Sequence, residues 1–490
     1  MSPHGISTFC LIWLPALAAC GAAPPERATQ DSAPASPPPS SEKRAVSTHD
    51  WTRFGWDASR SSAATDETGI GAGNVGTLRR QQVTLDGTVD ASAIYLHRVR
   101  VNGGRHDVFF VTTTYGKTLA IDADSGTIFW RFIPSGYDTW AGSRRITNST
   151  PVADPTREFI YAASPDGHVQ KLAVADGHVV WSTAITKLPE REKIASPLNY
   201  DHGRLIATTG GYIGDAPPYQ GHVAILDATS GRLVHVWNSL CSDRHELIDP
   251  NSCSESGNAI WGRAGAVIDT TTGDIFVATG NGLWDGRTSW GDAAIELDSS
   301  ATKVVDNYTP TNTEELSARD ADLGSTSPVL LGGGYVAQGG KDRSIRVLEF
   351  RRTRGALPRR GGEVQAVSTP SGAGLFTAPA VLRSGSTTRL FAADNGGTAA
   401  WSFSGGQLRQ MWRNGNGGTS PVIAGGLLYV YDAGGSLRVY EPQSGQQLVA
   451  LTSGGGHWNS PIVVDGRIAL PEGDANQHRT TGVLNIWRLP

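Results

Sequence analysis

The sequence predicts an all-β fold, in which four-stranded antiparallel sheets form the blades of an eight-bladed β-propeller. A similar unit of about 40 to 50 residues returns along the chain, and repeats of this length are typical of blades or solenoids. Glycine is abundant, with 60 residues, and Asp-Gly, Gly-Gly and Asn-Gly turn pairs suit many short antiparallel strands. No long stretch keeps a helical period, so we expect little helix.

Each unit starts with a small residue and proline, followed by a strand, a glycine turn, a second strand and an Asp-Gly-type hairpin. Six such starts are Thr150-Pro151, Ser196-Pro197, Ser327-Pro328, Ala378-Pro379, Ser420-Pro421 and Ser460-Pro461. The long interval between Pro197 and Pro328 holds a seventh unit, GRAGAVIDTTTGDIFVATGNG, with Gly265 in place of the proline. An eighth unit lies upstream of Pro151 and ends at Trp130. The chain therefore has eight units.

Tryptophans close several units at a fixed place. Trp130 and Trp181 each lie four residues after a hairpin glycine, whereas Trp237 and Trp412 lie six residues after theirs. Because side chains alternate between the two faces of a strand, both offsets put the ring on the same face. We expect these rings to be core side chains wedged between neighbouring blades, with Tyr308 taking this place in the fourth unit.

The N-terminus has the features of an exported protein. The apolar stretch from Phe9 to Ala19 is too short to span a bilayer and is typical of a signal peptide. Leu17-Ala18-Ala19-Cys20 resembles the bacterial lipobox, in which the cysteine is acylated. We expect a lipoprotein signal peptide over residues 1–19, a disordered tether rich in Pro, Ala and Ser over residues 20–47, and the propeller over residues 48–490.

The residue after the cysteine bears on the cellular location. Cys20 is followed by Gly21 and not by aspartate, which resembles the sorting pattern of lipoproteins of the outer membrane. The resemblance implies a periplasmic protein anchored to the outer membrane by lipidated Cys20. The alternative is an ordinary cleaved signal peptide and a soluble periplasmic product.

Two cysteines lie outside this leader, Cys241 and Cys253, and they bracket one polar loop. In an oxidising compartment a disulfide is the natural interpretation. A metal site is the weaker alternative, because no second cysteine pair completes four ligands. No C-x-x-C-H motif is present, so the sequence does not indicate an attached c-type haem.

The net charge of −4 argues against nucleic acid as the main partner. The basic stretch RRTRGALPRRGG from Arg351 is either a solvated loop or a docking patch for an anionic partner. Gly71, Gly73 and Gly76 match G-x-G-x-x-G, but they follow a polar loop instead of a strand, which argues against a dinucleotide site. No nucleophile elbow or zinc-protease motif is present.

The repeats resemble those of the pyrroloquinoline quinone (PQQ) repeat family of β-propellers. The tryptophan-docking pattern of that family is matched by Ala120, Asp122, Gly126 and Trp130. The segments DWTRFGWDASRSS and NVGTL are similar to the opening of quinoprotein dehydrogenases. The resemblance covers nearly the whole chain after the leader. It implies that the N-terminal strand completes the last blade, so that both ends of the chain close the ring.

The middle of the chain resembles the cofactor site of quinoprotein alcohol dehydrogenases. The resemblance implies Trp261 as the floor under PQQ, Asn281 as a metal ligand through its amide oxygen, and Asp320 as the catalytic base. It further implies Asp322 as an additional metal ligand and Lys341 as the donor to the quinone carbonyls. The cofactor would be PQQ with Ca²⁺ or a lanthanide.

These residue types suit that chemistry. A hard cation held by carboxylate and amide oxygens acts as a Lewis acid. A carboxylate within hydrogen-bond reach of an alcohol takes its proton. The pattern also departs from the family, because Ala216 stands at the position of a metal-binding glutamate and Gln220 at that of an arginine. Asp215 is a candidate replacement for the glutamate, and the adjacent-cysteine pair of many alcohol dehydrogenases is missing.

Each candidate residue also has a structural interpretation. Trp261 can be an inter-blade wedge, Asn281 part of a tight Asn-Gly turn, Asp320 and Asp322 loop caps, and Lys341 a solvated turn residue.

Two functions remain open at this stage. One is a quinoprotein oxidoreductase that acts on an alcohol or sugar and passes electrons to a separate acceptor. The other is a non-catalytic scaffold, similar to the propeller lipoprotein of outer-membrane barrel assembly, whose partners would be envelope proteins. The lipobox favours the scaffold, whereas the set of Trp261, Asn281, Asp320 and Lys341 favours the enzyme.

Overall fold

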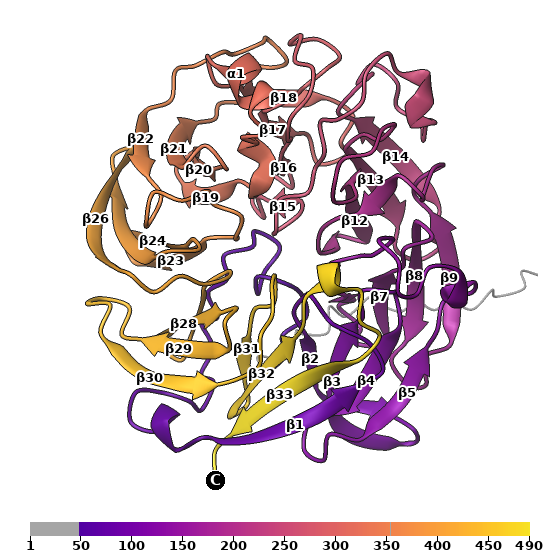
Figure 1. Cartoon of the computed structure of the whole chain (residues 1–490), viewed down its shortest axis with the longest axis vertical. Helices are drawn as coiled ribbons and strands as arrows, with labels where there is room; N and C mark the ends of the chain where they lie inside the picture. Colours follow the sequence, from indigo (N-terminus) through magenta and orange to yellow (C-terminus); the bar gives the residue numbers. More distant parts are fainter. Residues whose placement is uncertain (1–48, 353) are drawn as a thin grey trace, which may run out of the picture. The chain divides into compact units, whose positions relative to one another are not determined.

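The computed structural model describes residues 49–490 other than residue 353, and these residues form eight antiparallel sheets arranged as a ring (Figure 1). The prediction of an all-β, eight-bladed propeller is confirmed. The α-helix of the described residues is the single short segment α1 (Thr313–Ala318). No helix in this part of the chain is long and apolar enough to cross a membrane. The expected signal peptide, tether and lipidated Cys20 lie outside the described residues and stay predictions.

Blades 1 to 4 take their strands in chain order. Blade 1 consists of β2 (Ile94–Val101), β3 (Gly104–Thr112), β4 (Thr118–Asp122) and β5 (Ile128–Phe132). Blade 2 consists of β6 (Val152–Ala153), β7 (Phe159–Ala163), β8 (His168–Ala173) and β9 (Val179–Ala184). Blade 3 consists of β10 (Glu192–Ile194), β12 (Arg204–Gly211), β13 (His222–Asp227) and β14 (Leu233–Asn238), with β11 (Asn199–Asp201) also pairing with β12. Blade 4 consists of β15 (Val267–Ile268), β16 (Ile275–Ala278), β17 (Ala294–Leu297) and β18 (Val304–Tyr308).

Blades 5 to 7 follow the same order, and blade 8 combines both ends of the described chain. Blade 5 consists of β19 (Val329–Gly332), β20 (Tyr335–Gly339), β21 (Ser344–Glu349) and β22 (Gln365–Ser368). Blade 6 consists of β23 (Ala380–Ser384), β24 (Thr387–Ala393), β25 (Thr398–Ser404) and β26 (Gln407–Asn414). Blade 7 consists of β27 (Val422–Ala424), β28 (Leu427–Asp432), β29 (Ser436–Tyr440) and β30 (Gln447–Thr452). Blade 8 consists of β31 (Ile462–Val464), β32 (Arg467–Glu472), β33 (Gly482–Arg488) and β1 (Arg79–Leu85).

Five short 3₁₀ segments lie between the strands of the described chain: η1 (Val75–Thr77), η2 (Tyr137–Thr139), η3 (Pro250–Ser252), η4 (Leu323–Ser325) and η5 (Ala475–Gln477). Burial decreases toward the outer edge of a blade, since all residues of the inner strand β4 are buried whereas the outer strand β9 has no buried residue. The centre of β4, Leu119 to Ile121, is apolar without interruption, as expected of a strand that is covered on both faces. The core clusters join neighbouring blades; one of them combines residues of β2 to β5 with residues of β7 and β8.

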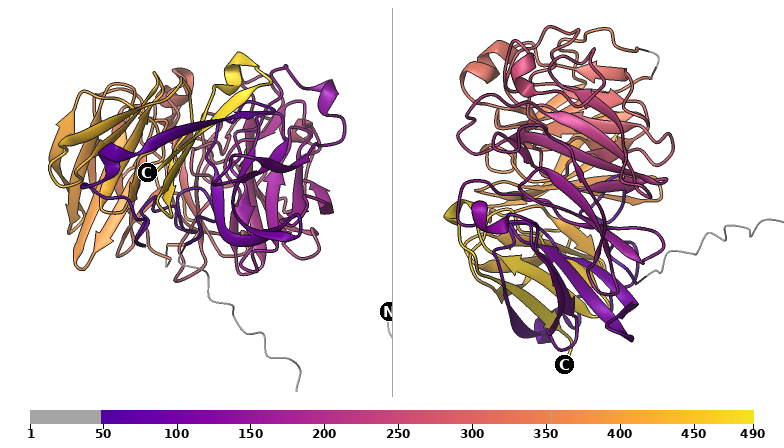
Figure 2. Two further views of the ribbon diagram at one scale, coloured as in Figure 1. Left: turned by 90° about the horizontal axis from the view of Figure 1, so that it is seen from below. Right: turned by 90° about the vertical axis from the view of Figure 1, so that its right-hand side faces the viewer.

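The ring is closed by strand β1, which pairs antiparallel with β33 from Arg79 opposite Arg488 to Leu85 opposite Gly482. The indigo strand therefore lies beside the yellow strands in Figure 1 and in the side views of Figure 2. This closure is the one that the family resemblance implied. Because β1 pairs with β33, it completes blade 8, covers the outer edge of β33 and joins the two ends of the propeller.

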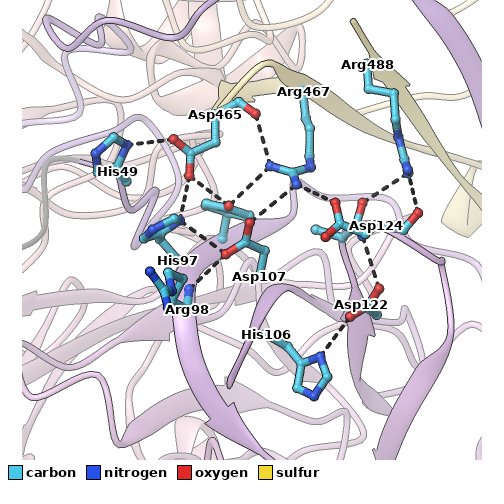
Figure 3. Close-up of polar contacts among 12 residues, drawn as sticks. His49, His97, Arg98, His106, Asp107, Asp122, Asp124, Asp465, Arg467 and Arg488 are labelled. Carbon is cyan, nitrogen blue, oxygen red and sulfur yellow. Dashed lines mark hydrogen bonds and ion pairs between the residues drawn. The ribbon is translucent and has the colours of Figure 1, made fainter. Parts of the chain in front are cut away.

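A cluster of charged side chains ties blade 8 to blade 1 (Figure 3). Arg467 of β32 lies 3.3 Å from the carboxylate of Asp107 and 2.5 Å from that of Asp124, both in blade 1. His97 of β2 lies 3.1 Å from Asp107 and 2.9 Å from Asp465, which precedes β32. The seam between the two chain ends is therefore held by ion pairs as well as by the β1 to β33 ladder.

Trp130 docks between blades 1 and 2, as the sequence predicts for the unit-closing tryptophans. Its indole Nε1 donates to the backbone oxygen of Val174 at 2.9 Å, and the side chain is 7% exposed. The ring covers Gly177, whose φ is +77° and where a Cβ would lie 2.5 Å from Trp130 Cε3. Trp181 covers Gly231 and Trp412 covers Gly445 in the same manner, which explains the glycine in these three hairpins.

The expected disulfide is present, because Cys241 and Cys253 are bonded to each other. The basic stretch from Arg351 pairs with acidic residues of the same chain. Arg351 lies 2.6 Å from Glu349, and Arg354 lies 3.0 Å from the buried Asp306. Much of the positive charge in this loop is therefore neutralised within the protein.

Candidate functional site

A cavity of about 430 Å³ lies where connecting segments from most of the blades converge. Its wall includes Lys193 of blade 3, Asn281 of blade 4, Lys341 of blade 5, and Trp458 from the connection between blades 7 and 8. Loops at one end of a propeller ring can meet only around its axis. The cavity is therefore assembled from residues that are far apart in the sequence.

All five side chains named for the site from the sequence line this one cavity: Trp261, Asn281, Asp320, Asp322 and Lys341. Trp261 lies between β14 and β15, Asn281 follows β16, the two aspartates lie between α1 and β19, and Lys341 follows β20. The structure thus brings together the whole set that the sequence placed there. Their individual roles stay predictions.

Polar contacts hold four of these residues to one another. Lys341 Nζ lies 2.6 Å from Asp320 Oδ1 and forms a second ion pair with Asp322. Asn281 donates from its side-chain Nδ2 to Asp320 Oδ1 at 2.8 Å and from its backbone N–H to Asp322 Oδ1 at 2.7 Å. Lys341 Nζ also lies 5.4 Å from the centre of the Trp261 ring. The cluster is therefore one connected network.

The charge of Lys341 is set by two opposing effects. Burial disfavours the ammonium form, but the carboxylates of Asp322 and Asp320 outweigh it, and the pKa of Lys341 is raised above its usual value. Lys341 is therefore a cation at neutral pH. Asp320 has a φ of +53°, a left-handed conformation that aspartate adopts more readily than most residues. Its side chain is 69% exposed, whereas that of Asp322 is 7% exposed.

Oxygen atoms suited to a metal ion lie beside this network. The side-chain Oδ1 of Asn281 is buried and has no hydrogen-bond partner among the described residues. A buried acceptor without a partner is costly unless a ligand or ion satisfies it. At Gly280 a Cβ would lie 2.3 Å from Asp322 Oδ1, so only glycine lets that carboxylate approach the backbone here. Asn281 and Asp322 thus supply a hard oxygen donor set.

The departures from the family pattern acquire a structural explanation. Gln220 is buried and donates to Asn238 Oδ1 at 3.2 Å, which makes it part of the core of blade 3. Asp215 lines the cavity, accepts a hydrogen bond from the Tyr219 hydroxyl at 3.2 Å, and has a raised pKa because of burial. The carboxylates of Asp322 and Asp320 raise this pKa further, so Asp215 is close to them. A carboxylate therefore stands near the place where the family has glutamate.

Sequence reasoning missed several cavity residues, above all Lys193, Arg263 and Trp458. Arg263 donates from Nε to the Trp458 backbone oxygen at 3.1 Å and from Nη1 to the Asn148 backbone oxygen at 3.2 Å. Its position two residues after Trp261 was a usable indication. Lys193, in the stretch REKIASP, carried no indication that separates it from a solvated lysine.

Aromatic side chains form a second wall of the cavity. The ring of Trp261 lies 6.3 Å from that of Phe376, which in turn lies 6.0 Å from that of Trp458. All three rings line the cavity. A row of aromatic rings beside charged groups suits a flat ligand that carries charge at its edge.

The fold and the cavity together define a quinoprotein-like β-propeller. A family model described as outer membrane protein assembly factor BamB matches residues 81–246 and 360–481, more than half of the chain. The chain belongs to this family of PQQ-repeat propellers.

Among characterised proteins the chain is similar to alcohol-oxidising enzymes. It is 24% identical over 275 residues to polyvinylalcohol dehydrogenase of Pseudomonas sp., which covers 50% of this chain and 42% of that protein. It is 23% identical over 197 residues to quinohemoprotein alcohol dehydrogenase ADH IIB of Pseudomonas putida, which covers 36% of this chain and 27% of that protein. The chain therefore spans less than half of the length of these relatives.

Solved structures confirm the fold. The quinohemoprotein alcohol dehydrogenase of Comamonas testosteroni superposes with a TM-score of 0.64 at 16% identity, covering 90% of this chain and 81% of that one. BamB of Moraxella catarrhalis superposes with a TM-score of 0.51 at 14% identity, covering 84% of this chain and 98% of that one. At such identities the likeness establishes the propeller and leaves the activity open.

Proposed function

We propose that this protein is an exported quinoprotein dehydrogenase that oxidises the hydroxyl group of an alcohol or sugar and passes the electrons to a separate acceptor. The observation that carries the proposal is the convergence of Trp261, Asn281, Asp320, Asp322 and Lys341 in one cavity. A propeller that serves only as a scaffold has no need for this set. The similarity to alcohol dehydrogenases over part of the chain supports the same conclusion.

The residues present fit PQQ and a metal ion. Asn281 Oδ1 and the carboxylate of Asp322 would hold the ion, with Asp215 as the further carboxylate. Trp261 would support the face of the quinone and Lys341 would bind its carbonyl oxygens. When bound, PQQ with Ca²⁺ or a lanthanide supplies a quinone that accepts hydride and a Lewis acid that polarises it.

The chain itself supplies the base and its alignment. Asp320 accepts the proton of the substrate hydroxyl, because its carboxylate is exposed to the cavity. Lys341 and the amide of Asn281 both contact Asp320 Oδ1, so they fix this oxygen and leave the other one free for substrate. The exposed position of Asp320 lets the proton pass on to solvent.

The proposed location follows from the N-terminal sequence. We place the protein in the periplasm, anchored to the outer membrane by lipidated Cys20, which lies outside the described residues. The family description, which names an outer membrane assembly factor, supports an envelope location.

A second function has its own support. The family model carries the description of an outer membrane assembly factor, and Ala216 and Gln220 replace two residues of the cofactor pattern. The second candidate is therefore a non-catalytic scaffold that binds envelope proteins and takes up no quinone.

Reconstitution separates the two candidates. Purified protein is mixed with PQQ and Ca²⁺ or a lanthanide, and the spectrum of bound quinone and dye-linked alcohol oxidation are recorded. If the protein is a dehydrogenase, we expect both the spectrum of bound quinone and the oxidation of alcohol. Asp320→Asn should keep the bound quinone and abolish turnover, whereas Asp176→Asn, at a similarly exposed aspartate paired with His178 outside the cavity, should leave turnover unchanged. Absence of quinone binding supports the scaffold.

A further inference from the structure

Two cationic side chains of the cavity wall have no part in the proposed chemistry. Lys193 belongs to β10 of blade 3, and Arg263 lies between β14 and β15. Both line the same cavity as the predicted site, and Arg263 is only 4% exposed. Neither has the position of the family arginine, which is occupied by the structural Gln220.

Neither cation forms an ion pair with any described residue, and their contacts are to neutral groups. Arg263 donates from Nε and Nη1 to two backbone oxygens, while its Nη2 is buried and has no hydrogen-bond partner in the described chain. Lys193 Nζ contacts the side-chain oxygen of Asn148. A buried charge without an opposite charge is unfavourable. The unpartnered Nη2 therefore indicates a ligand atom that the protein does not supply.

The carboxylate whose charge acts on both cations, Asp90, is already engaged. Asp90 is buried and accepts hydrogen bonds from His457 Nδ1 at 2.9 Å, from the Trp458 backbone N–H at 2.6 Å and from the Ala475 backbone N–H at 3.1 Å. Asp90 acts on Lys193 and Arg263 only through its charge. It does not neutralise two cations at once.

Both groups stay charged at neutral pH. Burial lowers the pKa of Lys193 to about 8 and that of Arg263 to about 10, although Asp90 partly opposes the effect in each case. Since each also repels the other, an anion bound between them would relieve both the desolvation and the repulsion. The aromatic rings of Trp261, Phe376 and Trp458 beside these cations favour a ligand with an aromatic face.

We propose that Lys193 and Arg263 form an anion subsite that binds the carboxylate groups of a planar aromatic polycarboxylate. The inference rests on the proposed function for the identity of this ligand, because PQQ is itself an aromatic tricarboxylate. In this chain the cations come from β10 and from the segment after Trp261, so residues outside the family pattern would hold the carboxylates of the cofactor.

The test measures binding and needs no turnover. Metal-free protein is titrated with trimesate, an aromatic tricarboxylate without a quinone, with PQQ, and with the uncharged trimethyl ester of PQQ, by calorimetry and tryptophan fluorescence. Arg263→Gln and Lys193→Gln should each weaken trimesate and PQQ by about tenfold or more, which corresponds to about 1.4 kcal/mol. Lys171→Gln removes a buried lysine outside the cavity and is the matched control, which should bind both ligands like the unaltered protein.

The outcomes separate this inference from the proposed function. Trimesate binding that depends on Arg263 or Lys193 without any uptake of PQQ supports the subsite and contradicts the quinoprotein proposal. PQQ binding of equal affinity in the unaltered protein and both folded variants overturns the subsite and leaves the quinoprotein proposal standing. If Arg263→Gln does not fold, Lys193→Gln carries the test, because Lys193 is at the wall and makes a single side-chain contact.

A pH series provides a second readout. Lys193 faces the charged groups Asp90 and Arg263, and with its pKa at about 8 it loses its proton between about pH 7 and 9 while Arg263 stays charged. Trimesate affinity should therefore fall over this range in the unaltered protein and stay nearly constant in Lys193→Gln. An equal fall in both proteins would contradict the role of Lys193.

Discussion

Replacement of Gly177 by alanine tests how tryptophan docking holds neighbouring blades together. Gly177 has a φ of +77°, where an alanine costs about 1–2 kcal/mol of backbone energy. Its Cβ would also lie 2.5 Å from Cε3 and 2.7 Å from Cδ2 of Trp130. The indole ring cannot move away freely, because it is buried and its Nε1 donates a hydrogen bond to the backbone oxygen of Val174. Overpacking should therefore destabilise the fold by about 1–3 kcal/mol more. The expected total destabilisation is about 2–5 kcal/mol.

Gly203→Ala is the matched control. Its φ is +78°, but no atom lies within 4 Å of the Cβ position, so only the backbone cost of about 1–2 kcal/mol applies. The assay is urea unfolding followed by fluorescence and circular dichroism, with the two midpoints compared at equal slope. Gly177→Ala should have the lower midpoint. Equal midpoints for the two variants would refute the docking argument.

The remaining predictions concern stability. Burial raises the pKa of Glu192 to about 7, so the folded protein binds this proton more tightly than the unfolded chain and loses stability as the pH rises from about 4.5 to 7. Glu192→Gln should therefore be more stable at pH 8 by up to about 3 kcal/mol and gain little at pH 4, as urea midpoints will show. Reduction of the Cys241–Cys253 disulfide, which closes a loop of 12 residues, should lower the free energy of unfolding by about 2–3 kcal/mol. In the variant with both cysteines replaced by serine, a reductant should leave the urea midpoint unchanged. Arg467→Met should lower the free energy of unfolding, measured by urea denaturation, by about 1 kcal/mol through the loss of its ion pairs with Asp107 and Asp124, an effect that high salt should diminish.

The fold could be predicted because each blade carries its own local pattern. The starts with a small residue and proline, the glycine turns and the tryptophan offsets recur within single units, so eight units could be counted without knowledge of their arrangement. The irregular parts of the fold were harder to predict from the sequence. Blade 3 has five strands, because both β10 and β11 pair with β12, and the helix α1 lies in an insertion between blades 4 and 5. Such insertions follow no period.

The site could be predicted in part. The order of Trp261, Asn281, Asp320 and Lys341 resembles the family pattern, and the structure places all of them in one cavity. Lys193 could not be found, because the cavity is built from loops of different blades and the sequence does not say which loop cations face inward. Hydrophobic periodicity indicates which residues belong to the core, whereas the role of a cationic side chain depends on the groups that surround it in space.

We propose that this cavity binds a quinone cofactor together with a metal ion. The most direct measurement is equilibrium dialysis of the purified protein with PQQ, with and without Ca²⁺ or a lanthanide, followed by the absorption spectrum of the retained quinone. We expect near-stoichiometric, metal-dependent retention that Trp261→Ala and Asn281→Ala each reduce strongly. Retention that is absent, or that is indifferent to both the metal and Asn281, would contradict the account.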